Sequence, residues 1–130
     1  SMVVHVPCAK RDHLEIATGS SGDTGSTIWH ATHIMAEIMT REICACEQPQ
    51  TILELGSGTG CLALQLAADC PRKTRVIATD LPEQMKLLKF NASRNQLRHA
   101  VRCVPWDWTA DAPALEWTDI GWGIARDVGY

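Results

Sequence analysis

The sequence of 130 residues lacks several features that would each indicate a class of protein. It has no apolar run near the roughly 20 residues that a membrane-spanning helix needs, and its N-terminus lacks the apolar segment of a signal peptide. It also has no block of Lys or Arg, and its net charge is −3. Such a surface is poorly suited to nucleic-acid phosphates. We therefore expect neither a membrane nor a nucleic acid as partner. We expect a cytoplasmic location, with the nucleus also open.

Disulfide and metal signals are weak as well. Six cysteines are present, but without a secretory context we expect them to be reduced and buried. Cys44 and Cys46 are the one close pair, and at a helix end this spacing points the two side chains apart. His30 and His33 could share a helix face, but nothing else supplies ligands to them. No metal site is predicted.

Apolar residues make up 45% of the chain, enough for the core of one domain. Two short β-like pieces, at 3–6 and 13–16, precede a loop rich in glycine and hydroxyl residues at 18–25. We expect residues 1–25 to form an N-terminal extension and residues 26–130 to form the core domain.

The predicted core begins with a helix from about residue 28 to 43, with Ser26 or Thr27 as its N-cap. The apolar residues expected on its packing face are Ile28, Ala31, Met35, Ile38 and Met39.

Strands and helices alternate along the rest of the chain. Strands are expected from Thr51, at 75–79, at 99–104 and, weakly, at 119–125; helices are expected at 61–68 and after Pro82. Strands separated by helices pair in parallel through right-handed crossovers. The predicted fold is therefore α/β, a doubly wound Rossmann-like parallel sheet with strand order 3-2-1-4.

The run TILELGSGTG, residues 51–60, reads as a buried strand that enters a glycine turn and opens onto the next helix. Glycine permits positive φ and lets a ligand approach the backbone, and the N-terminus of the helix is partly positive. In such sheets ligands sit beyond the carboxyl ends of the strands. Glu54, Asp80, Trp106–Trp108 and Asp127 all fall there.

The spacing of these residues discriminates between two cofactors that contain adenosine. Asp80, at the end of the second core strand, can accept hydrogen bonds from two ribose hydroxyls, which suits either a nicotinamide dinucleotide or S-adenosylmethionine (SAM). The dinucleotide fingerprint is G-x-G-x-x-G, whereas here G-x-G-x-G is followed by Cys61. Glu54, two residues before the first glycine, suits the cationic amino and sulfonium end of a methyl donor. The pattern favours SAM, with a dinucleotide oxidoreductase as a distant alternative.

Residues 52–60, followed by Ala78–Leu81, resemble motif I and the acidic post-I loop of class I, seven-strand methyltransferases. Three further segments are similar to those of the small protein-lysine methyltransferases that act on Hsp70, valosin-containing protein and calmodulin. They are Gly25–His30, Trp106–Thr109 and Asp127–Tyr130.

This resemblance covers roughly residues 13–130 and implies a set of cofactor-binding residues. They are Trp29, Glu54, Gly56, Ser57, Gly58, Gly60, Asp80, Leu81 and Trp108. In the family the glycine turn passes around the methionine part of SAM, and the acid at the position of Asp80 holds the ribose. The positions of Leu81 and Trp108 flank the adenine, and that of Trp29 closes the methionine end.

The resemblance also implies the reaction, which is methyl transfer to a lysine of a protein substrate with S-adenosylhomocysteine (SAH) as product. Asp127 and Tyr130 would border the methyl-transfer site and position the acceptor amine. Because the sulfonium methyl is already activated, catalysis is mainly alignment of a neutral amine. The alternatives are a small-molecule methyltransferase and a truncated, non-catalytic SAM-binding or regulatory fragment. Arg126, where relatives mostly have a small residue, favours the fragment.

The seven-strand fold continues with three more strands after the position of Tyr130. We therefore expect a sheet truncated after its fourth strand, with strands 5–7 missing. The open edge of the fourth strand would invite self-association.

Overall fold

The computed structural model describes residues 2–19, 25, 27–46, 48, 50–70 and 74–113. In chain order its elements are β1 (Met2–Pro7), β2 (His13–Thr18), α1 (His30–Cys44), β3 (Thr51–Leu55), α2 (Cys61–Asp69), β4 (Arg75–Asp80), the 3-10 helix η2 (Pro82–Gln84), α3 (Met85–Arg94) and β5 (Val101–Pro105). The predicted fourth core strand, at 119–125, lies outside the described residues, as do Arg126, Asp127 and Tyr130.

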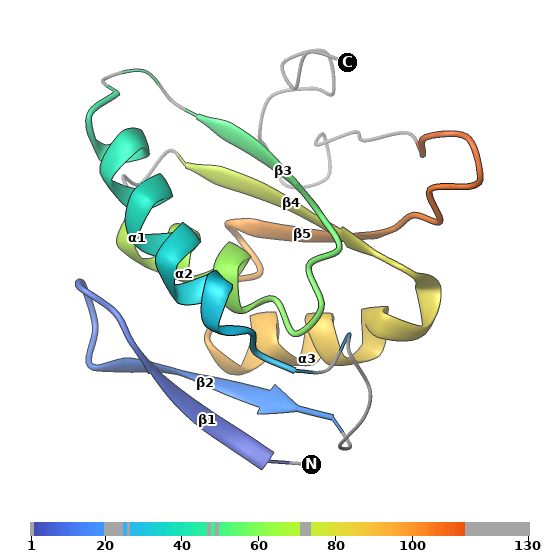
Figure 1. The fold of residues 1–130 in the computed structure, drawn as a ribbon, viewed down its shortest axis with the longest axis horizontal. Helices are drawn as coiled ribbons and strands as arrows, with labels where there is room; N and C mark the ends of the chain where they lie inside the picture. Colours follow the sequence, from blue (N-terminus) through green and yellow to red (C-terminus); the bar gives the residue numbers. More distant parts are fainter. Residues whose placement is uncertain are drawn as a thin grey trace.

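The centre of the molecule is a three-stranded parallel sheet with the order β3-β4-β5 (Figure 1). Thr51 pairs with Arg75 and Val76 pairs with Val101, so all three strands end at the same edge. The strands are joined through α2 and α3, as the alternating pattern predicted. The predicted α/β class with a Rossmann-like parallel sheet is confirmed.

Helices α2 and α3 lie between this sheet and the antiparallel hairpin formed by β1 and β2 (Figure 1). The shared core takes apolar side chains from all three layers. Its fully buried members include Leu14, Ile16, Leu64, Val76 and Leu88. Burial of each such side chain contributes about 2 kcal/mol.

Asn91 of α3 and Asn95, the C-cap of that helix, attach the hairpin to the helix. Asn91 Oδ1 accepts the backbone N–H of Ala17 at 2.8 Å, and its Nδ2 donates to the Ala17 carbonyl at 3.0 Å. Asn95 makes the same pair of bonds with Glu15, at 2.8 and 2.9 Å. The two side-chain amides therefore satisfy the outer edge of β2 as a further strand would.

Helix α1 differs from its prediction at its start and in its packing face. It begins at His30, and its N-cap is Trp29 in an extended conformation, so the predicted cap at Ser26 or Thr27 is wrong. Of the predicted face, Ile28 and Met39 are partly buried against the core, whereas Met35 and Ile38 are exposed. The fully buried residues of the helix are Ala36 and Ile43.

The physical reason is the close packing of α1 on its neighbouring helix. α1 packs on α2, and the small side chain of Ala36 permits the close approach of two helices that a row of larger side chains would prevent.

The cysteines also depart from expectation. All six are free thiols, but only Cys61 and Cys70 are buried. No helix in the described ranges is long and apolar enough to cross a membrane.

Candidate cofactor site

The glycine turn between β3 and α2 forms the floor of the site. Gly56, Gly58 and Gly60 all have positive φ, at +68°, +57° and +86°. At Gly58 a Cβ atom would also lie 2.8 Å from the backbone oxygen of Gly25. Another residue there would be strained in φ and would collide with backbone, so this position requires glycine.

Asp80 fixes the turn to the end of β4. Its Oδ2 accepts the N–H of Gly58 at 2.7 Å, and its Oδ1 accepts the N–H of Leu81 at 2.7 Å. The N–H of Ser57 donates to the Thr79 carbonyl at 2.8 Å. A carboxylate offers about four acceptor sites, so Asp80 can hold the turn and still accept hydroxyl groups of a ligand.

Glu54 brings an uncompensated carboxyl group to the same place. Among the described residues, Glu54 Oε1 and Ser57 Oγ are buried and have no hydrogen-bond partner. Burial raises the pKa of Glu54, and the nearby charge of Asp80 adds to the rise. The nearby Ser57 hydroxyl offsets part of this rise in pKa, although Ser57 Oγ and Glu54 Oε1 do not form a hydrogen bond of good geometry. A cationic ligand group would remove this mismatch.

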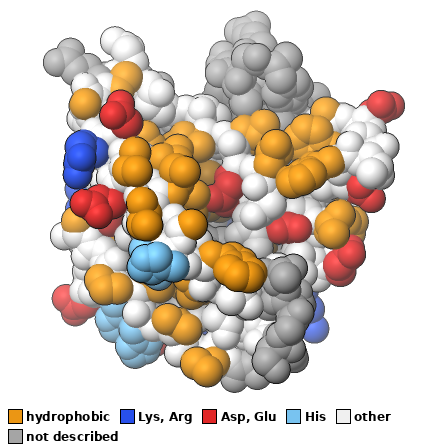
Figure 2. All heavy atoms as spheres, viewed as in Figure 1, with side chains coloured by type: hydrophobic (Ala, Val, Ile, Leu, Met, Phe, Trp, Pro, Cys, Tyr) orange, Lys and Arg blue, Asp and Glu red, His pale blue; other side chains and the backbone are white. Residues whose placement is uncertain are grey.

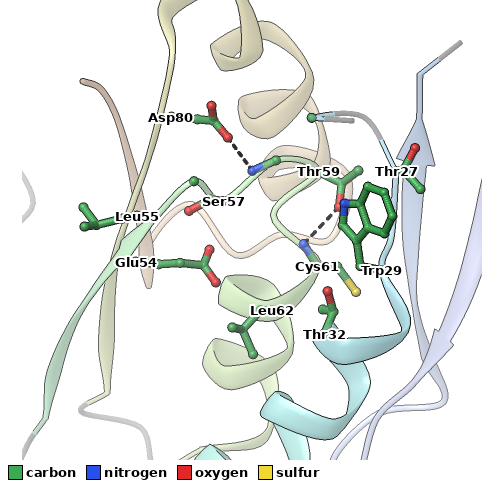
Figure 3. A pocket seen from close by; sticks show the side chains of 13 residues that line it. Thr27, Trp29, Thr32, Glu54, Leu55, Ser57, Thr59, Cys61, Leu62 and Asp80 are labelled. Atoms are coloured by element: carbon green, nitrogen blue, oxygen red, sulfur yellow. Dashed lines mark hydrogen bonds between the residues drawn. The ribbon is translucent and has the colours of Figure 1, made fainter. Parts of the chain in front are cut away.

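A cavity of about 490 Å³ opens beside these groups. Figure 3 shows the Glu54 carboxylate pointing into it, towards α2 and the start of α1. Trp29 and Thr32 line it from α1, and Cys61 and Leu62 line it from α2. The volume lies in the range of small-molecule and cofactor sites.

A second cavity of about 250 Å³ adjoins the first, and Gly56 and Asp80 line both. Its other walls are Leu81 and Trp106–Thr109, which follow the ends of β4 and β5. Figure 2 shows one group of hydrophobic side chains over α1 and another near the end of β5, with further hydrophobic side chains below them. Acidic side chains lie between the two groups.

The paired cavities define the ligand that they can accept. The larger one carries an unpartnered carboxylate, Asp80 stands at the junction, and the smaller one has aromatic walls. This suits an extended molecule with a cationic group at one end, a diol in its middle and an aromatic ring at the other end. SAM has these three parts in this order, so the residues present fit it.

Most of the residues predicted to bind cofactor gather at these cavities. Trp29, Glu54, Gly56, Ser57, Gly58 and Asp80 line the larger one, and Leu81 and Trp108 line the smaller one. Gly60 lines neither cavity. It is the N-cap of α2 and faces α3, since a Cβ at this position would lie 2.6 Å from Leu88 Cδ1. Asp127 and Tyr130, predicted at the methyl-transfer site, lie outside the described residues.

Several lining residues were not singled out from the sequence. They are Thr32, Leu55, Thr59, Cys61 and Leu62. Gly25, Thr27, Trp106, Asp107 and Thr109 lie in the motif segments named above, although no individual role was predicted for them. A usable signal existed for Thr32, which follows Trp29 by three residues along α1. His30 is exposed and is not among the lining residues.

Two further titratable groups border the cavities. Burial raises the pKa of the Cys61 thiol to about 12, and the charge of Glu54 contributes. Cys61 is therefore a neutral wall residue rather than a nucleophile. Hydrogen bonds from the hydroxyl and backbone N–H of Thr109 lower the pKa of Asp107. These bonds shape the turn that carries Trp108.

Comparison with known proteins places this site in a family context. A family model described as lysine methyltransferase matches residues 9–130. A bifunctional methyltransferase of Rickettsia prowazekii (strain Madrid E) is 29% identical over 77 residues, which are 58% of this chain and 15% of that protein. A release factor glutamine methyltransferase of Bordetella pertussis is 37% identical over 70 residues, which are 53% of this chain and 25% of that protein.

The fold has relatives among solved structures. A SAM-dependent methyltransferase from Agrobacterium tumefaciens superposes with a TM-score of 0.62 at 16% identity, covering 78% of this chain and 31% of that one. At this identity the likeness concerns the fold. The chain spans a quarter or less of the length of the two curated relatives.

Proposed function

The chain belongs to the lysine methyltransferase family, and we propose that it binds SAM at the glycine turn and takes part in methyl transfer to a lysine side chain of a protein. The observation that carries this proposal is the pair of acids around the turn. At one side Glu54 presents a buried oxygen that has no hydrogen-bond partner among the described residues, and Asp80 stands at the junction of the two cavities on the other.

Each residue has a role in this proposal. Glu54 would accept from the cationic end of the cofactor, and Asp80 would accept from the ribose hydroxyls. Leu81 and Trp108 would enclose the adenine, while Trp29 would cover the methionine end. The bound cofactor supplies a methyl group that its sulfonium already activates.

The acceptor side of the reaction rests on residues outside the described ranges. We propose that Asp127 and Tyr130 orient the lysine amine, which must be neutral to accept a methyl group. An apolar or aromatic surrounding disfavours the ammonium form, whereas a carboxylate favours it. Asp127 would therefore act through orientation, and the aromatic side chains would promote deprotonation.

Cofactor binding is tested by calorimetric titration of the chain with SAH and, separately, with NAD. We expect binding of SAH alone. Asp80→Ala should weaken it at least about tenfold, since charge-assisted hydrogen bonds are each worth about 2 kcal/mol, and the matched control Asp111→Ala, at an exposed position, should not. Absence of SAH binding by the intact chain would refute the cofactor assignment.

The acceptor is tested separately, by incubating the chain with SAM labelled on its methyl group and a cell lysate. Labelled protein is then hydrolysed and its methylated amino acids are separated. Methyl-lysine that disappears with Asp127→Ala but persists with Asp111→Ala supports the proposal. Methyl-glutamine would point to the acceptor named for the Bordetella relative. Label confined to small molecules would indicate a small-molecule methyltransferase, and SAH binding without any label would indicate a non-catalytic SAM-binding fragment.

A further inference from the structure

Three potential metal ligands, His5, His13 and Glu15, lie together on the outward face of the hairpin. His5 pairs directly with Glu15 across the two strands, and His13 lies two residues before Glu15 on β2. Side chains at these positions share one face of a two-stranded sheet. The opposite face carries Val6, Leu14 and Ile16 into the core.

The donor atoms are already close. His5 Nε2 lies 3.7 Å from Glu15 Oε1, and the rings of His5 and His13 are stacked with their centroids 4.3 Å apart. One ligand atom from each of the three residues lies within 4.8 Å of the others. Tetrahedral coordination with bonds of about 2.1 Å needs donors roughly 3.3 Å apart. The lone pairs of two stacked imidazoles run nearly parallel, so binding one ion requires the rings to rotate out of the stack. Both histidines are exposed, which leaves them free to do so.

The carboxylate is held in place as a metal ligand would be. Arg94 Nε donates to Glu15 Oε2 at 3.2 Å, which leaves Oε1 directed at His5. Asn95 fixes the backbone N–H and carbonyl of the same residue. Hydrogen bonds of this kind orient metal-ligating carboxylates and tune their affinity.

From this arrangement we propose that the hairpin binds one borderline divalent transition-metal cation, such as Zn²⁺, through His5, His13 and Glu15. Two imidazoles and one carboxylate make a set found in zinc sites that keep a fourth position for water. The site lies on the β1–β2 hairpin, and none of its three residues lines the cavities at the glycine turn. Its direct effect is to link β1 to β2. Imidazole donors place Cu²⁺ and Ni²⁺ among the other cations that it would accept.

The test is a titration of the untagged, reduced chain with Zn²⁺. Binding is measured by calorimetry and by the NMR signals of the histidine rings. We expect one equivalent to bind and to shift the rings of His5 and His13. His5→Gln and His13→Gln should each lower the affinity by about tenfold or more. His33→Gln and His99→Gln, at exposed histidines elsewhere on the chain, are the matched controls and should leave it unchanged.

Cysteine is the competing ligand, and Co²⁺ separates the two cases. Cobalt bound by imidazole and carboxylate gives no sulfur-to-metal charge-transfer absorption, whereas cobalt bound by thiolate does. A thiolate spectrum that persists in His5→Gln and His13→Gln would overturn the proposal. So would histidine rings that do not respond to Zn²⁺ in the wild-type chain.

Discussion

A single residue, Glu54, carries much of the chemistry of the cofactor site. Its carboxyl group is buried beside a second acid, Asp80, and its Oε1 has no hydrogen-bond partner among the described residues. A buried polar atom without a partner lowers stability. Its persistence in a cavity wall is typical of a group that acts on a ligand.

The substitution Glu54→Gln separates stability from binding. Because the folded-state pKa of Glu54 is raised, its contribution to stability is greatest below the unfolded-state pKa and is lost as the pH rises through the folded-state pKa. At pH 7 the amide should therefore raise the free energy of unfolding by about 1 kcal/mol. The substitution should also weaken SAM binding by about tenfold or more, since a neutral amide cannot form an ion pair with a cation.

Urea unfolding at pH 5 and pH 7 and calorimetry with SAM measure the two effects. The matched control is Glu42→Gln at an exposed position of α1, which should change neither. A loss of stability at pH 7 with Glu54→Gln would show that the carboxylate is compensated in the folded chain.

At the scale of elements, helix α3 connects the hairpin to the glycine turn through Asn91. This side chain is fully buried and bonds to both backbone groups of Ala17. Its Nδ2 also donates to the carbonyl of Thr59 at 2.8 Å. One amide therefore sets β2, α3 and the turn relative to one another.

Replacing Asn91 with Ala should remove the hydrogen bonds that join β2 and the glycine turn to α3. Three backbone groups would lose their partner, at about 1 kcal/mol or more each, so we expect the free energy of unfolding to fall by about 3 kcal/mol. SAH affinity should fall as well, because the turn at Thr59 is released. Chemical denaturation and calorimetry report both, with Ser93→Ala at an exposed position of α3 as control. A variant as stable as this control would show that the connection is not needed.

At the scale of the whole molecule, the sheet, helices and hairpin share one core, so a ligand at the glycine turn should stabilise the chain as a unit. A ligand present at about 100 times its dissociation constant stabilises the folded state by about 2.7 kcal/mol.

For a chain of this size that free energy corresponds to a rise in Tm of roughly 10 °C. We expect this rise in a thermal melt with SAH, no rise with NAD, and a much smaller one with SAH and Asp80→Asn. Equal shifts with SAH and NAD would indicate a non-specific effect.

Much of the fold and of the cofactor site could be predicted from the sequence. The alternation of strands and helices, the glycine turn, and the positions of Glu54 and Asp80 are local patterns, because strand period, turn chemistry and helix capping depend on neighbouring residues. The family prediction is confirmed by the match over residues 9–130. The roles of individual site residues, including Asp127 and Tyr130, stay predictions.

Only the tertiary structure decided which groups meet. It buried Ala36 and Ile43 of α1, which were not predicted, and left Met35 and Ile38 of the predicted face exposed. It left Glu54 Oε1 without a hydrogen-bond partner in the described part of the chain, placed Asn91 on Thr59, and brought His5 and His13 beside Glu15. These contacts join residues that are distant in the chain or on facing strands. Such contacts are set by how helices pack and how strands register, which no local pattern of residues encodes.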